Sequence, residues 1–141
     1  MGNKIDFESA SIPGVFIGKI KPHIDHRGKF YRLFDLNDIK SIVSKPIVEV
    51  NFSENKEKGT VRGMHYENIP DKNYKIIKCI KGSLSDYLID IRKGSKTFLK
   101  KIVFKLFEDD NKLILVPNKV AHGFQTLEAN TSLLYMHTIM Y

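Results

Sequence analysis

The sequence predicts an all-β protein, an antiparallel sandwich or barrel with at most one or two short helices. Short apolar or alternating segments recur along the 141 residues, with turn signals about every ten residues. Only one segment has helical spacing instead. A long series of short strands is typical of antiparallel sandwiches and barrels. The length suits one domain with its own core, and no repeat, low-complexity tract or linker divides residues 1–141.

Nine segments have the composition or the alternation of strands. The clearest is residues 84–91, which place Leu84, Asp86, Leu88 and Asp90 on one face and the intervening residues on the other. In chain order the segments are residues 15–20, 29–34, 47–52, 75–80, 84–91, 102–106, 113–116, 123–127 and 132–136.

The segments between the strands are polar, with one exception. Residues 23–28 are expected to form a polar turn, and the run 53–59 is rich in turn-forming residues. The exception is a short helix that Asp35 or Asn37 is placed to cap, with apolar residues at helical spacing as far as Ile42.

Composition excludes several classes of protein. A hydrophobic fraction of 42% is ordinary for a globular protein. No run approaches the roughly 18–20 apolar residues that cross a bilayer, and charges interrupt the N-terminal segment, so we expect neither a signal peptide nor a membrane partner. The single cysteine, Cys79, lies in an apolar run and is expected to be a buried, inert thiol. A cytoplasmic protein is predicted.

The basic residues do not indicate a nucleic-acid-binding protein. The net charge is +7, but the lysines are scattered, with no block of five or more and no aromatic stacking motif. Arginine is rare, and Arg27 and Arg62 each precede a glycine. A planar, bidentate guanidinium at such positions suits a phosphate or carboxylate ligand, although surface ion pairs are the alternative.

The chemistry-bearing residues favour proton transfer over metal catalysis. A metal site of the His-x-His type is absent, because His65 is followed by Tyr66 and Glu67. A site made of His65, Glu67 and His122 is conceivable but disfavoured, so no metal or other cofactor is predicted. No nucleophile-elbow, Walker or dinucleotide motif occurs. Histidine, lysine, tyrosine and arginine remain, a set suited to moving protons and holding an anion.

A series of motifs in a fixed order carries a family resemblance. They are Asp25-His26-Arg27-Gly28-Lys29-Phe30, Asn51-Phe52-Ser53, residues 59–66 with Arg62-Gly63-Met64-His65, Lys75 before the Gly82 turn, residues 90–98, residues 116–124, and the pair Tyr135 and Tyr141. The chain resembles the dTDP-4-dehydrorhamnose 3,5-epimerases over nearly its whole length. This resemblance implies a cupin or jelly-roll fold and epimerisation of a 4-keto-6-deoxy sugar on a nucleoside diphosphate, in deoxysugar or O-antigen biosynthesis.

The resemblance also implies a role for each matching residue. His65 would remove the proton next to the C4 ketone, Lys75 would stabilise the enolate, and Tyr135 would return a proton from the opposite face. The implied substrate-binding residues are Arg27, Arg62 and His122 at the diphosphate and sugar, Asn51 within the site, and Tyr141 stacked on the base.

Two departures from the family pattern concern substrate recognition. Glu49 stands where glutamine is usual, at a position associated with the base. A carboxylate only accepts hydrogen bonds, which suits the N1–H and amino group of guanine. We therefore hypothesise a GDP-linked rather than a dTDP-linked sugar. Arg32 stands where glutamate is frequent, which also alters the pocket.

The third departure is the end of the sequence at Tyr141, since typical relatives continue and their tail supplies an aspartate that orients the base histidine. Either an internal acid such as Asp86 or Asp90 substitutes, or the base is weaker and the reaction narrower. We predict epimerisation at one carbon, C3, rather than at both C3 and C5. A noncatalytic sugar-nucleotide-binding protein and a 3,4-ketoisomerase are the rival interpretations. A homodimer is expected, because cupins commonly protect edge strands by pairing with a second copy.

Overall fold

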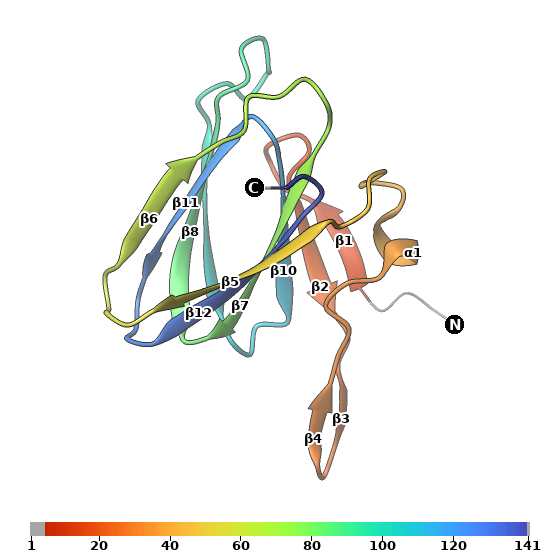
Figure 1. Ribbon diagram of the computed structural model, residues 1–141, viewed down its shortest axis with the longest axis vertical. Coiled ribbons are helices and arrows are strands. Elements are labelled where there is room, and N and C mark those ends of the chain that lie inside the picture. The colour runs from red at the N-terminus through yellow and green to blue at the C-terminus, as the bar shows by residue number, and fades with distance from the viewer. Residues whose placement is uncertain (1–4, 141) are drawn as a thin grey trace.

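The computed structural model of the protein describes residues 5–140, which form two facing antiparallel sheets (Figure 1). The six-stranded sheet has the order β1 (Ile5–Ser9), β2 (Phe16–Ile20), β10 (Lys112–Pro117), β7 (Tyr74–Lys81), β12 (Thr131–His137), β5 (Glu49–Asn55). The four-stranded sheet has the order β6 (Val61–His65), β11 (Val120–Thr126), β8 (Ser83–Asp90), β9 (Lys101–Phe107). The predicted β-sandwich is confirmed, and its sheets do not close into a barrel.

The alternation of the central strands produces two separate cores. On β7 the side chain of Ile77 faces the other sheet, while that of Ile76 faces outward. The inner core between the sheets contains Ile77, Cys79, Leu84, Leu88, Leu106, Ile114, Phe124 and Leu133. The outer core contains Ile76, Leu115 and Met136 with Ile5, Ile20, Ile39, Val43 and Leu113. The buried position predicted for Cys79 is confirmed, and burial raises the pKa of its thiol to about 12.

The helix of the described residues is α1 (Leu36–Ile39), which packs Ile39 into the outer core. Asp35 is its N-cap, since the carboxylate accepts a hydrogen bond from the backbone N–H of Asn37 at 2.8 Å. The predicted extension to Ile42 is wrong, because the helix ends after one turn. Among residues 5–140 no helix is long and apolar enough to cross a membrane.

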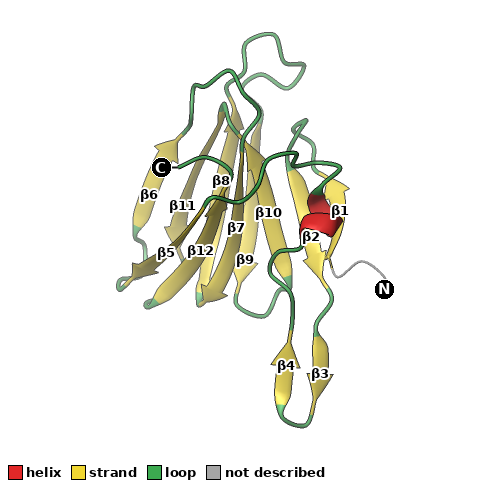
Figure 2. Cartoon of the chain, turned by 45° about the vertical axis from the view of Figure 1, so that its right-hand side comes forward, coloured by secondary structure: helices red, strands yellow, loops and turns green. Residues whose placement is uncertain are grey.

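The predicted polar turn at residues 23–28 is wrong, because these residues build most of a hairpin. It consists of β3 (His23–Asp25) and β4 (Gly28–Phe30), and it extends away from the sandwich (Figures 1 and 2). Asp25 shapes the turn by accepting hydrogen bonds from the backbone N–H of Arg27 at 2.9 Å and from its guanidinium at 2.7 Å. The strand expected over residues 29–34 therefore stops at Phe30.

Other strands also differ from expectation, because residues that look like turn or loop residues in the sequence are paired with another strand. β5 continues to Asn55, although residues 53–59 read as a turn. Asn55 is buried, its Nδ2 donates to the carbonyl of Thr131 at 3.1 Å, and its Oδ1 accepts from Arg62 at 2.7 Å. The charged N-terminal strand β1 was not expected, and it pairs with β2 at the edge of the sheet.

Candidate active site

A cavity of about 570 Å³ lies between β5, β7 and β12 of one sheet and β6 and β11 of the other. We call it the main cavity. Its lining combines cationic, carboxylate, amide and aromatic side chains with little aliphatic surface. The lining residues are Glu49, Asn51, Ser53, Arg62, His65, Lys75, His122, Phe124, Tyr135 and His137. Seven of the nine residues predicted for the site are among them.

The six-stranded sheet contributes two rows of side chains. Glu49, His137 and Lys75 are direct partners across β5, β12 and β7. Asn51 and Tyr135 are partners in the next row on the same face. Because directly opposed residues of antiparallel strands point to the same side, the strand register gathers these side chains from three parts of the chain. The rings of Tyr135 and His137 lie 6.2 Å apart.

The four-stranded sheet contributes the opposite side of the main cavity. His65 at the end of β6 is the direct partner of His122 on β11, and Arg62 pairs with Phe124 after a register shift. Glycines permit this approach, since a Cβ on Gly63 would lie 2.6 Å from the Cα of Gly123. Gly63 also has a φ of +116°, a conformation that other residues rarely adopt. The Arg-Gly-Met-His motif therefore brings the edge strand close enough to place His65 beside His122.

His122 is anchored by a buried carboxylate. Its Nε2 is hydrogen-bonded to Oδ1 of Asp86, and both side chains are almost fully buried. The other oxygen of Asp86 has no hydrogen-bond partner among the described residues. Buried carboxylates are costly unless paired, so the ring of His122 is strongly held in its position.

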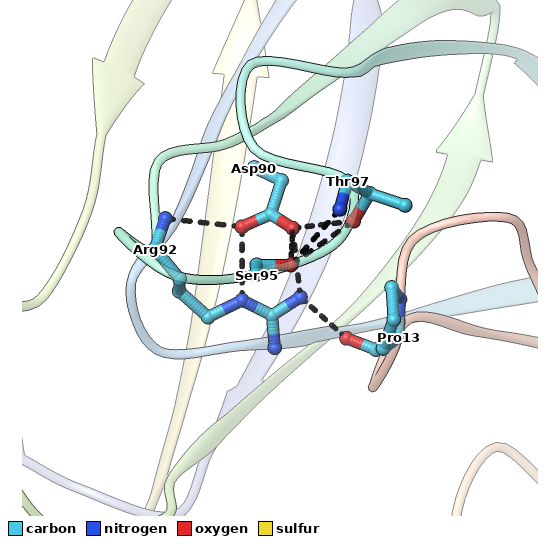
Figure 3. A network of polar contacts seen from close by, with 5 residues as sticks. All are labelled: Pro13, Asp90, Arg92, Ser95 and Thr97. Carbon is cyan, nitrogen blue, oxygen red and sulfur yellow. Dashed lines mark hydrogen bonds and ion pairs between the residues drawn. The ribbon is translucent and has the colours of Figure 1, made fainter.

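Asp90 forms a separate network, through its carboxylate, with residues of the loop that follows β8 (Figure 3). Its carboxylate accepts hydrogen bonds from Arg92 Nε at 2.9 Å and from the hydroxyls of Ser95 and Thr97 at 2.6 Å each. Burial by itself would raise the pKa of Asp90, but these hydrogen bonds outweigh it and hold the pKa well below its usual value. Arg92 also donates to the carbonyl of Pro13 at 2.6 Å, which ties the loop to the other sheet.

The expectation that Asp86 or Asp90 orients His65 is therefore wrong. Asp86 is bonded to His122, and Asp90 is bonded to Arg92, Ser95 and Thr97.

Burial shifts the titration of the cavity side chains. It lowers the pKa of Lys75, while the charges of Glu67 and Asp86 act in the opposite direction. It raises the pKa of Tyr135 strongly, with help from Asp86, so the phenol stays protonated at neutral pH. Burial also lowers the pKa of His137, and the neighbouring Lys75 adds to this effect. The main cavity therefore holds a protonated phenol and a neutral imidazole around one lysine.

Two predicted site residues are not gathered into the main cavity. Arg27 lies near the tip of the β3–β4 hairpin, where it forms an exposed ion pair with Asp25. Tyr141 lies outside the described residues. Among residues 5–140 no three His, Cys, Asp or Glu side chains are grouped as a metal site.

Sequence reasoning missed three lining residues, Ser53, Phe124 and His137. Two of them follow from strand alternation, because Ser53 is two residues after Asn51 and His137 is two residues after Tyr135. Phe124 carried no chemical signal, and its place depends on the register shift between β11 and β6.

Comparisons with known proteins agree with this geometry. The sequence model described as dTDP-4-dehydrorhamnose 3,5-epimerase matches residues 9–141. The dTDP-4-dehydrorhamnose 3,5-epimerase of Sinorhizobium fredii is 33% identical over 99% of this chain and 74% of its own length. That of Mycobacterium tuberculosis is 31% identical over 92% of this chain and 65% of its own length. The chain thus spans about two thirds to three quarters of these relatives.

Solved structures are similar over almost the whole chain. The dTDP-4-dehydrorhamnose 3,5-epimerase of Bacillus anthracis, with TDP and PPi bound, has a TM-score of 0.91 and 28% identity, covering 97% of this chain and 79% of its own. The dTDP-6-deoxy-D-glucose-3,5-epimerase of Legionella pneumophila, in complex with dTDP-4-keto-L-rhamnose, has a TM-score of 0.89 and 29% identity. The alignment with the Legionella protein covers 97% of this chain and 73% of that protein.

Proposed function

The chain belongs to the dTDP-4-dehydrorhamnose 3,5-epimerase family, a family of isomerases, and from this premise we propose that it epimerises a nucleoside-diphosphate 4-keto-6-deoxy sugar. One observation carries the proposal. His65 and Tyr135 line the same cavity from opposite sheets, with Lys75 on the strand next to that of Tyr135. Inversion of a carbon next to a ketone needs a base on one face, an acid on the other, and a cation at the ketone oxygen.

The reaction begins with removal of a proton. His65 takes the proton from the carbon next to the C4 ketone, and the electron pair of the C–H bond forms a C=C bond while the carbonyl oxygen becomes an enolate. Lys75 stabilises this negative charge, and a partly buried cation acts more strongly than one in open water.

The reaction ends with delivery of a proton to the opposite face. Tyr135 donates its phenolic proton to the same carbon, the enolate collapses to the ketone, and the configuration is inverted. The raised pKa of Tyr135 keeps its phenol protonated between turnovers. Before the next turnover, His65 releases its extra proton to solvent, and the tyrosinate of Tyr135 takes up a proton from solvent.

Substrate binding follows from the remaining lining residues. Arg62 is oriented by Asn55 and supplies a guanidinium for the diphosphate, and His122 is held by Asp86 beside the sugar. Asn51 lines the site next to Tyr135 and donates a hydrogen bond to Glu49 at 2.7 Å. The relatives act on dTDP sugars, and Glu49 is the basis of our hypothesis that this chain prefers GDP.

The finer assignments are part of the proposal. Epimerisation is confined to C3, the product serves deoxysugar or O-antigen biosynthesis, and the protein works in the cytoplasm. The protein forms a homodimer in this proposal, because two apolar side chains of the β3–β4 hairpin are left exposed. The exposed fraction is 74% for Ile24 and 68% for Phe30. A hairpin of two short strands is marginal in water unless its apolar side chains are covered. If a second copy covers this hairpin, Arg27 of one copy would lie near the site of the other.

Solvent isotope exchange tests the proposed function. The protein is incubated in deuterated water with 4-keto-6-deoxy sugars on GDP and on dTDP, and the products are analysed by mass spectrometry and NMR. One deuteron at C3 supports a 3-epimerase, and two deuterons indicate a 3,5-epimerase. A displaced ketone would identify a 3,4-ketoisomerase. Nucleotide binding without any exchange would identify a noncatalytic sugar-nucleotide-binding protein.

A further inference from the structure

A second cavity of about 260 Å³ adjoins the main cavity and has His65 and Lys75 in common with it. We call it the side cavity. Its lining is formed by the end of β6 and the segment after it, the start of β7 and the end of β10. The lining residues include His65, Glu67, Tyr74, Lys75 and Val116. The proposed base and the lysine proposed to stabilise the enolate are therefore reached from both cavities.

Among the described residues that line the side cavity, Glu67 alone is acidic. Glu67 is partly buried. Its backbone is held in place by a hydrogen bond, since the N–H of Lys119 donates to the carbonyl of Glu67 at 3.1 Å. The proposed mechanism gives this carboxylate no task.

The other carboxylates near Lys75 are engaged elsewhere. Asp86 is hydrogen-bonded to His122. Glu49 accepts a hydrogen bond from Asn51 and is separated from Lys75 by the strand that carries His137. Glu67 is thus the carboxylate best placed to balance the charge of Lys75, which desolvation penalises.

We propose that Glu67, which lines the side cavity together with Lys75, is a positioning residue of the active site whose carboxylate keeps the ammonium of Lys75 charged and directed at the ketone. The proposal rests on the proposed function, because it needs Lys75 to act on the ketone oxygen. A neutral amine there would lose most of its ability to stabilise an enolate. Glu67 touches no reacting atom and acts through Lys75.

Several other titratable groups surround Lys75 and belong to the same electrostatic environment. They are His65 from β6, Asp86 from β8, Glu49 from β5, Tyr74 from β7, and Tyr135 and His137 from β12, whereas the partner of Lys75 on β10 is the uncharged Val116. Of these, His137 has its pKa lowered by burial and by Lys75, so it adds no positive charge at neutral pH.

The first test is a titration of Lys75 in the free protein, which needs no substrate. The Cε signals of ¹³C-labelled lysine are followed by NMR against pH, and Lys75→Arg identifies the signal of Lys75. The variant is Glu67→Gln, with Glu67→Asn as a second neutral variant in case the first folds poorly. The matched control is Glu54→Gln, which removes the same charge from an exposed residue of β5 outside both cavities.

We expect Lys75 to lose its proton at a lower pH in Glu67→Gln than in the wild type, and Glu54→Gln to leave it unchanged. In turnover, we expect the alkaline limb of the kcat profile to move to lower pH. At neutral to mildly alkaline pH we expect kcat to fall on the order of tenfold, less than the 10²–10³ lost when a donor to an oxyanion is itself removed. KM should change little, and Glu67→Asp should restore most of kcat.

An unchanged titration of Lys75 in the Glu67 variants, or an equal shift in Glu54→Gln, would overturn the proposal. An unchanged alkaline limb with a shifted titration would also overturn it, because the charge of Lys75 would then not limit turnover. If the wild type binds nucleotide sugars without any exchange, the proposed function fails, and the NMR titration still decides whether Glu67 controls the charge of Lys75.

Discussion

Nε2 of His122 is hydrogen-bonded to Oδ1 of Asp86, a residue 36 positions earlier in the chain. His65, the direct cross-strand partner of His122, has no bond to either Asp86 or Asp90. The two adjacent imidazoles therefore differ in kind. The ring of His122 is hydrogen-bonded to a buried carboxylate, whereas His65 lies at the end of an exposed edge strand.

Asp86→Asn should destabilise the protein by about 1–3 kcal/mol, since a buried acceptor of a histidine hydrogen bond loses its charge. Chemical denaturation measures the change. The control is Asp109→Asn, which removes an exposed ion pair with Lys29 and should change the stability much less than Asp86→Asn does. Equal stabilities of the two variants would contradict the anchoring of His122.

His65→Ala and Tyr135→Phe should each lower kcat by about 10²–10⁴-fold, the usual contribution of a general acid or base. Steady-state turnover of the 4-keto sugar measures the loss. Tyr87→Phe, which removes a hydroxyl from the exposed face of β8, is the matched control for Tyr135→Phe and should leave kcat unchanged. Full activity of either site variant would refute its assigned role.

Glu49→Gln should reverse a preference for GDP over dTDP, because an amide both donates and accepts where a carboxylate only accepts. Isothermal titration with the two nucleotides should show GDP bound more tightly by the wild type, by about tenfold or more, as expected for a hydrogen bond to a charged group. Tighter binding of dTDP by the wild type would reject the GDP hypothesis.

Thr97→Val should weaken the network around Asp90. It should also reduce the loss in the free energy of unfolding that occurs when the pH is lowered. The pKa of Asp90 is lower in the folded protein than its ordinary value of 3.8, so its contribution to stability is present above that value and is lost as the pH falls through the lower, folded-state pKa. Removing one hydrogen bond should cost about 1 kcal/mol at pH 7 and less at pH 2.

Urea denaturation of the wild type and of Thr97→Val at both pH values measures this difference. Ser44→Ala, at an exposed position outside the network, serves as the control. A loss for Thr97→Val that is the same at pH 7 and pH 2 would show that the charge of Asp90 is not involved.

Ile24→Glu should convert the proposed homodimer into a monomer, because it replaces an exposed apolar side chain of the β3–β4 hairpin with a charged one. Sedimentation velocity measures the mass. Val103→Glu, an equally drastic change at an exposed position of β9, should leave the mass unchanged. A wild type that sediments as a monomer, or a dimer that survives Ile24→Glu, would contradict the assigned interface.

Much of the fold could be read from alternation along the chain. The faces assigned within residues 84–91 are correct, since Leu84, Asp86, Leu88 and Asp90 are all buried while Tyr87 is exposed. One of the errors occurs where a polar residue owes its strand conformation to a remote partner. Asn55 reads as part of a turn, yet it is buried through bonds to Thr131 and Arg62.

The sequence by itself determined the β-class, the family motifs and the side of its strand on which each residue of β8 lies, because a period of two is a local property of an extended chain. The tertiary structure decided which side chains meet. It joins Asp86 to His122, brings His137 between Glu49 and Lys75, and carries Arg27 away from the main cavity. The physical reason is register, since the partner of a residue across a sheet depends on strands that are distant in sequence.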